Sequence, residues 1–335
     1  MQPVIGVSGV QVIASARSRL QRKGAAQHAN AKPDMSNAVL VTGANGHLGQ
    51  RLLRQPGQWV AVVRSQRALA ALPAGPNIRH CVLDYADRAA LRAAMHGCTA
   101  AINLVGIIKQ SHTNSFEQAH QHTASALVDA AAEAGLQRIL QLSIIGATAR
   151  ANNACLASKG RADDLLMRGA TKALVLRLPM VLGEGDYASH ALVKRARAKL
   201  AITFRAASLE QPIYAGDVVQ ALLNALSIAL PSSEALDLAG PTSLSRRALT
   251  ERAATVLGRT TPPIISLPMA LGMSMAGVME LAANLTGGTA PVTRAMLGVL
   301  DHDDAIDPAA ASVRLGVQLT SLQQTLVHCL LDAQH

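Results

Sequence analysis

Three evenly spaced glycines give the clearest chemical signal in this sequence. Gly43, Gly46 and Gly49 stand in the stretch VLVTGANGHLGQRLL, between a short apolar run and a segment with helical spacing. In such a turn the first glycine permits the tight bend, the second lets the backbone approach a phosphate, and the third lets the helix pack on the strand. A glycine-rich turn without a ligand is the alternative. The strand before the turn and the helix after it favour a site for a dinucleotide pyrophosphate, bound at the positive end of the helix dipole.

The residues after the second apolar run indicate which dinucleotide binds. A site for NAD places a carboxylate there to accept a hydrogen bond from the ribose 2′-hydroxyl. This chain has VVRSQR instead, with Arg64 at the end of the run, Arg67 soon after it and no acidic residue nearby. A solvated loop arginine is the alternative. Because a guanidinium suits a 2′-phosphate through charge-assisted hydrogen bonds, we predict NADP(H) in preference to NAD(H).

Two further positions are predicted to reach the cofactor because each follows an apolar run. Asp84 would accept a hydrogen bond from the adenine amino group, and the NLVG stretch at 103–106 would lie beside the cofactor ribose. The predicted cofactor-binding residues are Gly43, Asn45, Gly46, His47, Leu48, Gly49, Arg64, Asp84, Tyr85, Asn103, Leu104, Val105, Gly106 and Lys159.

The alternation of apolar runs with helical segments predicts the fold that would position these residues. The expected buried strands are 38–42, 58–63, 78–84, 100–105, 138–143 and 173–178. Strands that alternate with helices predict a parallel sheet covered on both faces, which is a Rossmann-type, doubly wound α/β fold. After Pro179 the rhythm changes, with a short strand at 211–214 and a helix N-capped by Asp217. We therefore expect a Rossmann domain over 37–180 and a smaller, mainly helical C-terminal lobe over 181–335, with some strands returning to the sheet.

These motifs together resemble the extended and atypical short-chain dehydrogenases. The matching elements are T-G-x-x-G-x-x-G at 42–49, Asp84, the NLVG stretch, Ser143 and the Ser158-Lys159 pair. The stretches LRLPMVLGEGD and QPIYAGDVV are similar to later motifs of the sugar-epimerase-like members. More selectively, INLVGI, SIIGA, EQPIYAGDVVQAL and LDLAGPTSLS resemble the nucleotide-binding accessory subunit of respiratory complex I and its bacterial NAD(P)-binding, epimerase-like relatives. That resemblance implies tightly held NADPH and, for the accessory subunit itself, a place in a membrane complex.

The chain departs from the catalytic members of this superfamily at one position. Their general acid/base is a tyrosine four residues before the lysine, and this chain has Cys155 four residues before Lys159. Cys155 could shuttle a proton if Lys159 lowers its pKa, although a thiol reaches much less far than a phenol. Lys159 could still hold ribose hydroxyls, and Ser143 could cap the nicotinamide end. Lys159, Ser143 and Cys155 are therefore the candidate catalytic residues, in a pattern that favours binding without the usual chemistry.

Two functions follow from this pattern. The first is an NADP(H)-binding protein with a structural or sensing role near a respiratory or quinone-linked complex. The alternative is an NADP(H)-dependent reductase or epimerase that acts on a hydrophobic, quinone-like or isoprenoid-like substrate without the tyrosine. The expected partners are the dinucleotide and a membrane complex or membrane surface, contacted through the lobe segment 263–280.

Composition limits the other classes of function. Hydrophobic residues make up 50% of the chain and charged residues 16%, which indicates a folded protein with a large core. The four cysteines form no C-x-x-C pair, and the histidines, interpreted as helix-surface residues, have no metal-ligand spacing. We therefore predict no metal site and a reducing compartment. The net charge of +10 comes without a nucleic-acid-binding module, so it favours a surface that faces phosphates or anionic lipid.

Two segments have more than one interpretation. The stretch 263–279 carries no charge and is at the short limit for a membrane span, but it contains Pro268 and ends at Glu280. A buried or partner-facing helix is the prediction, and a helix lying on a membrane surface is the alternative. Residues 1–36 are rich in Ala, Ser and Arg, as a targeting leader is, although a disordered tail or a true start at Met35 also fits. The predicted location is cytoplasmic, with peripheral attachment to the inner membrane as the alternative.

Overall fold

A seven-stranded parallel sheet forms the centre of the fold. In the computed structural model, which describes residues 37–111 and 113–331, the strands lie in the order β11-β6-β5-β4-β1-β2-β3. Their bounds are β1 Ala38–Thr42, β2 Trp59–Val63, β3 Ile78–Val82, β4 Cys98–Asn103, β5 Arg138–Ile144, β6 Lys172–Leu178 and β11 Glu234–Asp237. The strand order reverses between β1 and β4, where doubly wound folds bind their ligands. The predicted Rossmann-type fold is confirmed, and the predicted leader lies outside the described residues.

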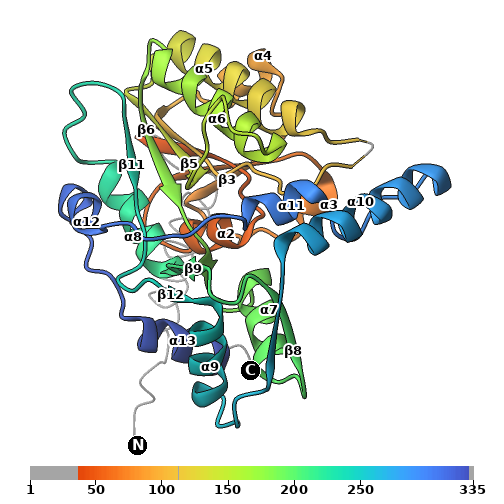
Figure 1. Cartoon of the computed structure of the whole chain (residues 1–335). Coiled ribbons are helices and arrows are strands. Elements are labelled where there is room, and N and C mark those ends of the chain that lie inside the picture. The colour runs from red at the N-terminus through yellow and green to blue at the C-terminus, as the bar shows by residue number, and fades with distance from the viewer. Residues whose placement is uncertain (1–36, 112, 332–335) are drawn as a thin grey trace, which may run out of the picture. The chain divides into compact units, whose positions relative to one another are not determined.

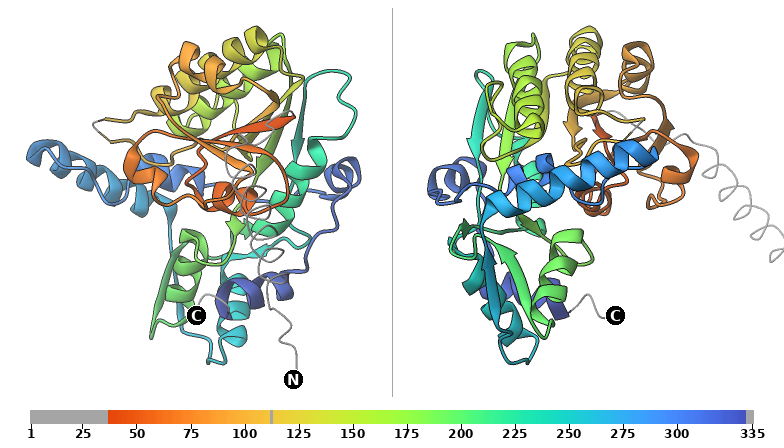
Figure 2. Two further views of the ribbon diagram at one scale, coloured as in Figure 1. Left: turned by 180° about the vertical axis from the view of Figure 1, so that it is seen from behind. Right: turned by 45° about the vertical axis from the view of Figure 1, so that its right-hand side comes forward.

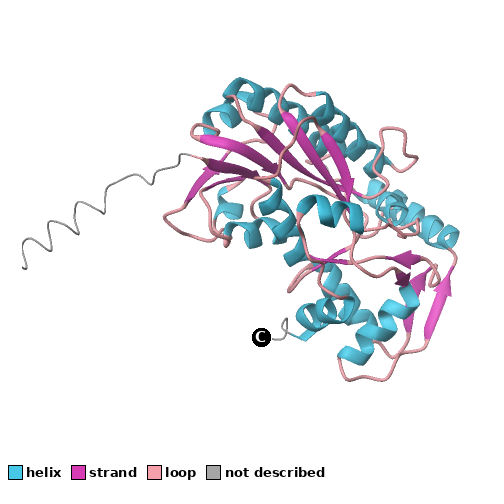
Figure 3. Ribbon diagram, turned by 90° about the vertical axis from the view of Figure 1, so that its left-hand side faces the viewer, coloured by secondary structure: helices cyan, strands magenta, loops and turns pink. Residues whose placement is uncertain are grey.

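Helices cover both faces of this sheet (Figures 1 and 3). On one face α4 packs against α5, and α5 packs against α6; on the other α2 packs against α8, and α8 against α12. Their bounds are α2 His47–Leu53, α3 Gln66–Leu69, α4 Arg88–Ala94, α5 Thr123–Ala134, α6 Ala154–Arg168, α8 Ala215–Ala225 and α12 Ala309–Leu315. A π-helical turn, η1 (Glu117–His122), leads directly into α5.

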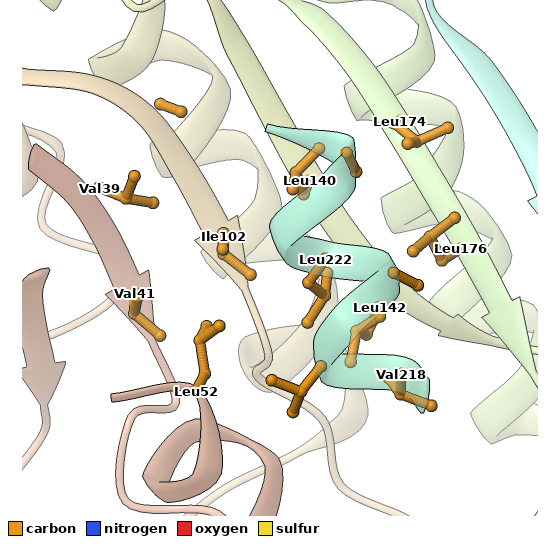
Figure 4. Packing of buried hydrophobic residues seen from close by; sticks show 14 of the residues in the cluster. Val39, Val41, Leu52, Ile102, Leu140, Leu142, Leu174, Leu176, Val218 and Leu222 are labelled. Carbon is orange, nitrogen blue, oxygen red and sulfur yellow. The ribbon is translucent and has the colours of Figure 1, made fainter. Parts of the chain in front are cut away.

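Aliphatic side chains fill the core between α8 and the sheet. Val218 and Leu222 of α8 pack in one buried cluster with Leu140 of β5 and Leu174 of β6 (Figure 4). All five residues of β1 and of β2 are buried, as expected for strands covered on both faces. The expectation of a buried strand is wrong for β3, whose side chains are half-buried or exposed because β3 lies at the edge of the sheet.

The remaining elements form the C-terminal lobe. Three small two-stranded sheets pair β7 with β10, β9 with β12 and β8 with β13, and the helices α7, α9 and α13 pack around a separate apolar cluster. Their bounds are β7 Val181–Leu182, α7 Tyr187–Ala196, β8 Ala201–Phe204, β9 Leu209–Glu210, β10 Ile213–Tyr214, β12 Leu244–Ser245, α9 Arg246–Val256, β13 Ile264–Leu267, α10 Met269–Thr286, α11 Arg294–Val299 and α13 Leu322–Leu331. The late strand β11 and helices α8 and α12 return to the Rossmann sheet.

Two sequence expectations in the lobe need correction. Asp217 does not cap α8, because that helix begins two residues earlier and the Asp217 carboxylate accepts hydrogen bonds from the amide and hydroxyl of Thr320 (both 2.7 Å). The apolar stretch 263–279 is not one helix either. Pro268 separates the strand β13 from α10, which extends outward beside α11 (Figure 2). Within 37–111 and 113–331, no helix combines the length and the apolar character needed to cross a membrane.

Candidate dinucleotide site

A cavity of about 630 Å³ opens where the strands β1 to β4 end. Nine of the predicted cofactor-binding residues line this cavity: Gly43, Asn45, Gly46, Arg64, Asp84, Tyr85, Leu104, Val105 and Gly106. Sequence reasoning missed five others: Ser65, Ala68, Ile107, Thr113 and Asn114. Ser65 is adjacent to Arg64 and could have been inferred from that position. Thr113 and Asn114 belong to a loop without any periodic pattern, so nothing in the sequence placed them here.

The glycine turn has the geometry that a pyrophosphate requires. Gly43 has a φ of +71°, and a Cβ atom there would lie 3.0 Å from the carbonyl carbon of Leu104. A Cβ atom on Gly49 would lie 2.5 Å from the carbonyl oxygen of Ala44, so only glycine lets α2 approach β1 this closely. Among the described residues no side chain caps α2 at Gly46, which leaves its first N–H groups for an anion. These residues fit a dinucleotide.

Arg64 is held at the rim of the first cavity by two neighbours. Its guanidinium lies over the ring of Tyr85, 5.7 Å from the ring centroid, and donates to Oδ1 of Asn114 at 3.2 Å. The Tyr85 hydroxyl in turn accepts from the amide of Gly43 (3.0 Å) and donates to the carbonyl oxygen of Val62 (3.1 Å). Tyr85 therefore links the arginine to the glycine turn, and the positive charge of Arg64 faces the part of the site that follows β2.

Three of the predicted glycine-turn residues lie on the other side of the turn. His47, Leu48 and Gly49 line a second cavity of about 340 Å³, which also contacts Val181 after β6. Asn103 lines neither cavity, because its buried side chain accepts from Thr42 (2.6 Å) and donates to Gln141 (2.7 Å). Asn103 therefore joins the ends of β1 and β4 to β5 and accepts from the amide of Val105, which lines the cofactor cavity.

Lys159 is buried beneath the NLVG stretch. Its Nζ atom donates to the carbonyl oxygens of Leu142 (3.0 Å) and Val105 (3.4 Å), and a Cβ atom on Gly106 would lie 2.9 Å from it. Burial lowers the pKa of the lysine, while the neighbouring Asp163 opposes that shift. Lys159 lines neither of the two cavities. Its ammonium group instead bonds to the backbone just after β4 and near the end of β5.

Cys155, which stands four residues before Lys159, has no exposed surface. Its Sγ atom donates to the carbonyl oxygen of Ile107 at 3.4 Å. Burial raises the pKa of the thiol to about 11, and the opposing effect of the Lys159 charge is smaller. The hypothesis that Lys159 lowers this pKa enough for proton transfer is therefore wrong, because desolvation outweighs the attraction between the charges.

Ser143 lines neither of the two cofactor cavities. The Oγ atom donates to Oδ2 of Asp163 at 2.7 Å, and both residues are buried. Burial raises the pKa of Asp163, while this hydrogen bond and the nearby charges of Lys159 and Arg177 act in the opposite direction. The buried carboxylate of Asp163 thus accepts from Ser143 and lies 3.6 Å from Nε of Arg177, while the charge of Lys159 acts on it without a hydrogen bond.

His120 is a buried residue of this region that the sequence analysis assigned to a helix surface. Its Nε2 atom accepts from the amide of Ile107 (3.1 Å), its ring stacks on Phe116, and Nδ1 has no hydrogen-bond partner among the described residues. Burial, followed by the positive charge of Lys159, lowers the pKa of His120 to about 3. The imidazole is therefore neutral. Its hydrogen bond with the Ile107 amide fixes the backbone that follows the NLVG stretch. Across the described ranges, no cluster of residues is suited to a metal ion.

Comparisons with known proteins agree with this site. Residues 43–202 match the NAD(P)H-binding family, and solved epimerase structures share the fold. The UDP-N-acetylglucosamine 4-epimerase from Bacillus cereus superposes with a TM-score of 0.65 at 15% identity, over 90% of this chain and 100% of that chain. The Bordetella bronchiseptica enzyme WbmH, solved with NAD⁺, superposes with a TM-score of 0.65 at 15% identity, over 89% and 98%. Residues 43–202 are therefore similar to NAD(P)H-binding proteins, and the chain has the fold of these solved structures.

Two proteins that are similar to this chain in sequence are named for different functions. NADH dehydrogenase [ubiquinone] 1 alpha subcomplex subunit 9 of Arabidopsis thaliana is 25% identical over 260 residues, which are 73% of this chain and 63% of that protein. Ceramide reductase of Caulobacter vibrioides is 30% identical over 160 residues, which are 46% of this chain and 49% of that protein. The alignments thus span less than two thirds of each relative's own length.

Proposed function

We propose that this protein binds NADP(H) tightly and uses it in a structural or sensing role, near a respiratory or quinone-linked complex. The observation that carries the proposal is the buried thiol of Cys155 at the position of the usual proton donor. With a pKa of about 11 and a hydrogen bond to the carbonyl oxygen of Ile107, this thiol is not directed at a substrate. A cofactor that binds only the native state would still stabilise the fold, by about 2.7 kcal/mol when its concentration is 100 times the Kd.

Preference for NADP(H) over NAD(H) rests on the surroundings of Arg64. The guanidinium stands beside the amide of Asn114, and these two side chains offer donors to a phosphate at the edge of the cavity. The carboxylate of Asp84, exposed after β3, lies farther along the same cavity and suits the adenine amino group. No acidic side chain follows β2 to bind a free 2′-hydroxyl.

A membrane complex or a membrane surface is the proposed partner of α10. One face of this helix carries large apolar side chains that are exposed at intervals of three and four residues, which is one side of a helix. They are Leu271, Met275, Val278, Leu281 and Leu285. An exposed apolar stripe of this kind is a common feature of docking surfaces. Similarity to a subunit of NADH dehydrogenase supports the same interpretation, and a cytoplasmic location with peripheral attachment to the inner membrane would follow.

The alternative is an NADP(H)-dependent reductase or epimerase that acts on a hydrophobic, quinone-like or isoprenoid-like substrate without the tyrosine, and the reductase is the form that the observations favour. The similarity to a ceramide reductase favours it, as does the largely apolar wall of the second cavity, which includes Leu48, Leu104 and Val181. Such an enzyme would need Lys159 and a bound water to supply the proton.

Turnover in the unaltered protein and in one variant separates the two functions. Lys159→Met keeps the approximate volume and removes the donor to the carbonyl oxygen of Val105, which lines the cofactor cavity, so NADPH binding should weaken in either case. The measurements are the Kd for NADPH and the rate of NADPH oxidation with long-chain ketones and with quinones. The proposed role predicts no turnover in the unaltered protein. Turnover that Lys159→Met abolishes would replace the proposal with the reductase.

A further inference from the structure

The two cavities at the glycine turn share one wall. Gly43, Gly46 and Leu104 line both of them. The larger cavity continues to Arg64 after β2, whereas the smaller one continues to Val181 after β6. The cavities therefore lie on opposite sides of the glycine turn, one towards each half of the sheet.

This arrangement assigns each cavity to one half of a dinucleotide. In a doubly wound fold the cofactor lies across the carboxyl ends of the strands, with its pyrophosphate at the glycine turn. β2 and β3 lie on one side of β1, and β4, β5 and β6 lie on the other. Because the charge of Arg64 and the carboxylate of Asp84 place the adenosine half over β2 and β3, the nicotinamide half must extend into the smaller cavity.

Tyr187 stands at the wall of that smaller cavity with 76% of its surface exposed. The other two tyrosines already use their hydroxyls within the protein. Tyr85 bonds to the glycine turn, and Tyr214 donates to Oε1 of Glu184 at 2.6 Å. In a chain with only 2% aromatic residues, an exposed phenol beside a ligand cavity is an unusual placement. Planar rings at such positions pack well against other planar rings.

The turn 183–186 fixes the start of α7, where Tyr187 is the first residue. Arg51 of α2 donates to the carbonyl oxygen of Glu184 (3.0 Å) and forms an ion pair with its carboxylate. Asp186 accepts from the amide of Ser189 at 2.7 Å and so caps α7. The turn is thus joined to the same helix whose N-terminus faces the pyrophosphate.

We infer that the turn 183–186 holds Tyr187 over the nicotinamide half of the bound dinucleotide, so that the phenol ring covers the nicotinamide ring. The inference rests on the proposed binding of NADP(H) and adds to it the residue that contacts the reactive end. A ring that lies between the nicotinamide and solvent also slows release of the cofactor, because release requires the loss of that contact.

The test compares a whole cofactor with a fragment that lacks nicotinamide. Kd values for NADPH and for adenosine 2′,5′-bisphosphate are measured by calorimetry for the full chain, Tyr187→Ala and Tyr187→Phe. We expect Tyr187→Ala to weaken NADPH binding by about tenfold, as the loss of one aromatic contact implies, and to leave bisphosphate binding unchanged. Tyr187→Phe keeps the ring and should bind both ligands like the unaltered protein.

Other outcomes overturn the inference. Unchanged NADPH binding in Tyr187→Ala would mean that the ring does not contact the cofactor. An equal increase in the Kd values for NADPH and the bisphosphate would indicate a general structural effect. If the unaltered protein bound neither ligand, the proposed function would fail together with the inference, which is a distinguishable result. Glu184→Gln provides a second variant, because loss of the ion pair with Arg51 should weaken NADPH binding and spare the bisphosphate.

Discussion

The thiol of Cys155 donates to the carbonyl oxygen of Ile107, 3.4 Å away, at a point where the cysteine has no exposed surface. The amide of the same isoleucine donates to Nε2 of His120. Ile107, which lines the cofactor cavity, therefore bonds to Cys155 through its carbonyl oxygen and to His120 through its amide. The described residues thus combine a cavity that fits a dinucleotide with a buried thiol at position 155.

Restoring the tyrosine should not restore chemistry. Cys155→Tyr adds a phenol ring to a fully buried position, and overpacking of this kind costs about 1–3 kcal/mol of folding stability. We expect a lower Tm and no reduction of carbonyl substrates with NADPH. Cys155→Ala is the matched control and should bind NADPH like the unaltered protein. A stable Cys155→Tyr variant with turnover would show that the phenol alone was missing.

Arg64 should determine the choice of dinucleotide. Arg64→Glu replaces donors for a 2′-phosphate with a repelling charge, and each charge-assisted hydrogen bond contributes about 1.5–3 kcal/mol. We expect at least about tenfold weaker NADPH binding and a much smaller change for NADH. Arg67→Glu makes the same change of charge on a residue that does not line the cavity, so its effect should be small. Tighter binding of NADH than of NADPH by the unaltered protein would contradict this assignment.

His120 should make the stability of the protein depend on pH. Its folded-state pKa of about 3 lies below the unfolded value of about 6.5, so only the unfolded chain gains this proton as the pH falls between those values. The contribution of His120 to the free energy of unfolding is complete above pH 6.5. As the pH falls below that value, the free energy of unfolding decreases by up to about 1.4 kcal/mol per pH unit.

Urea unfolding between pH 7.5 and 5 measures this dependence. His120→Gln keeps an acceptor for the Ile107 amide and should remove most of the slope that the histidine causes. His122→Gln changes a half-exposed histidine of the same helical turn and should leave the slope as it is. Identical slopes in all three proteins would mean that His120 is accessible to protons in the folded state.

Ser143 should matter for stability more than for the cofactor. Ser143→Ala removes the donor to the buried Oδ2 of Asp163, and an unsatisfied buried acceptor costs about 1–3 kcal/mol. A double-mutant cycle with Asp163→Asn should therefore give a coupling free energy above about 0.5 kcal/mol, with the NADPH Kd of Ser143→Ala changed less than about twofold. A large loss of NADPH affinity without loss of stability would instead support direct contact between Ser143 and the nicotinamide end.

The sequence predicted the sheet and the glycine turn because their causes are local. Alternating apolar runs specify the buried strands, and the close approach of Gly49 to Ala44 allows no side chain. Residues whose roles depend on distant partners were predicted poorly. Asp is a residue type that often caps helices, yet Asp217 accepts a hydrogen bond from Thr320, which lies 103 positions away. His120 has polar neighbours in sequence and becomes buried only when η1 packs on α6.

The exchange rate of bound NADPH tests the central claim most directly. The full chain would be purified, any nucleotide that accompanies it identified, and the bound NADPH exchanged against labelled NADPH. A structural or sensing role predicts that NADPH remains bound for hours. An enzyme must release its oxidised cofactor in every turnover, so exchange within seconds would contradict the account and support the reductase.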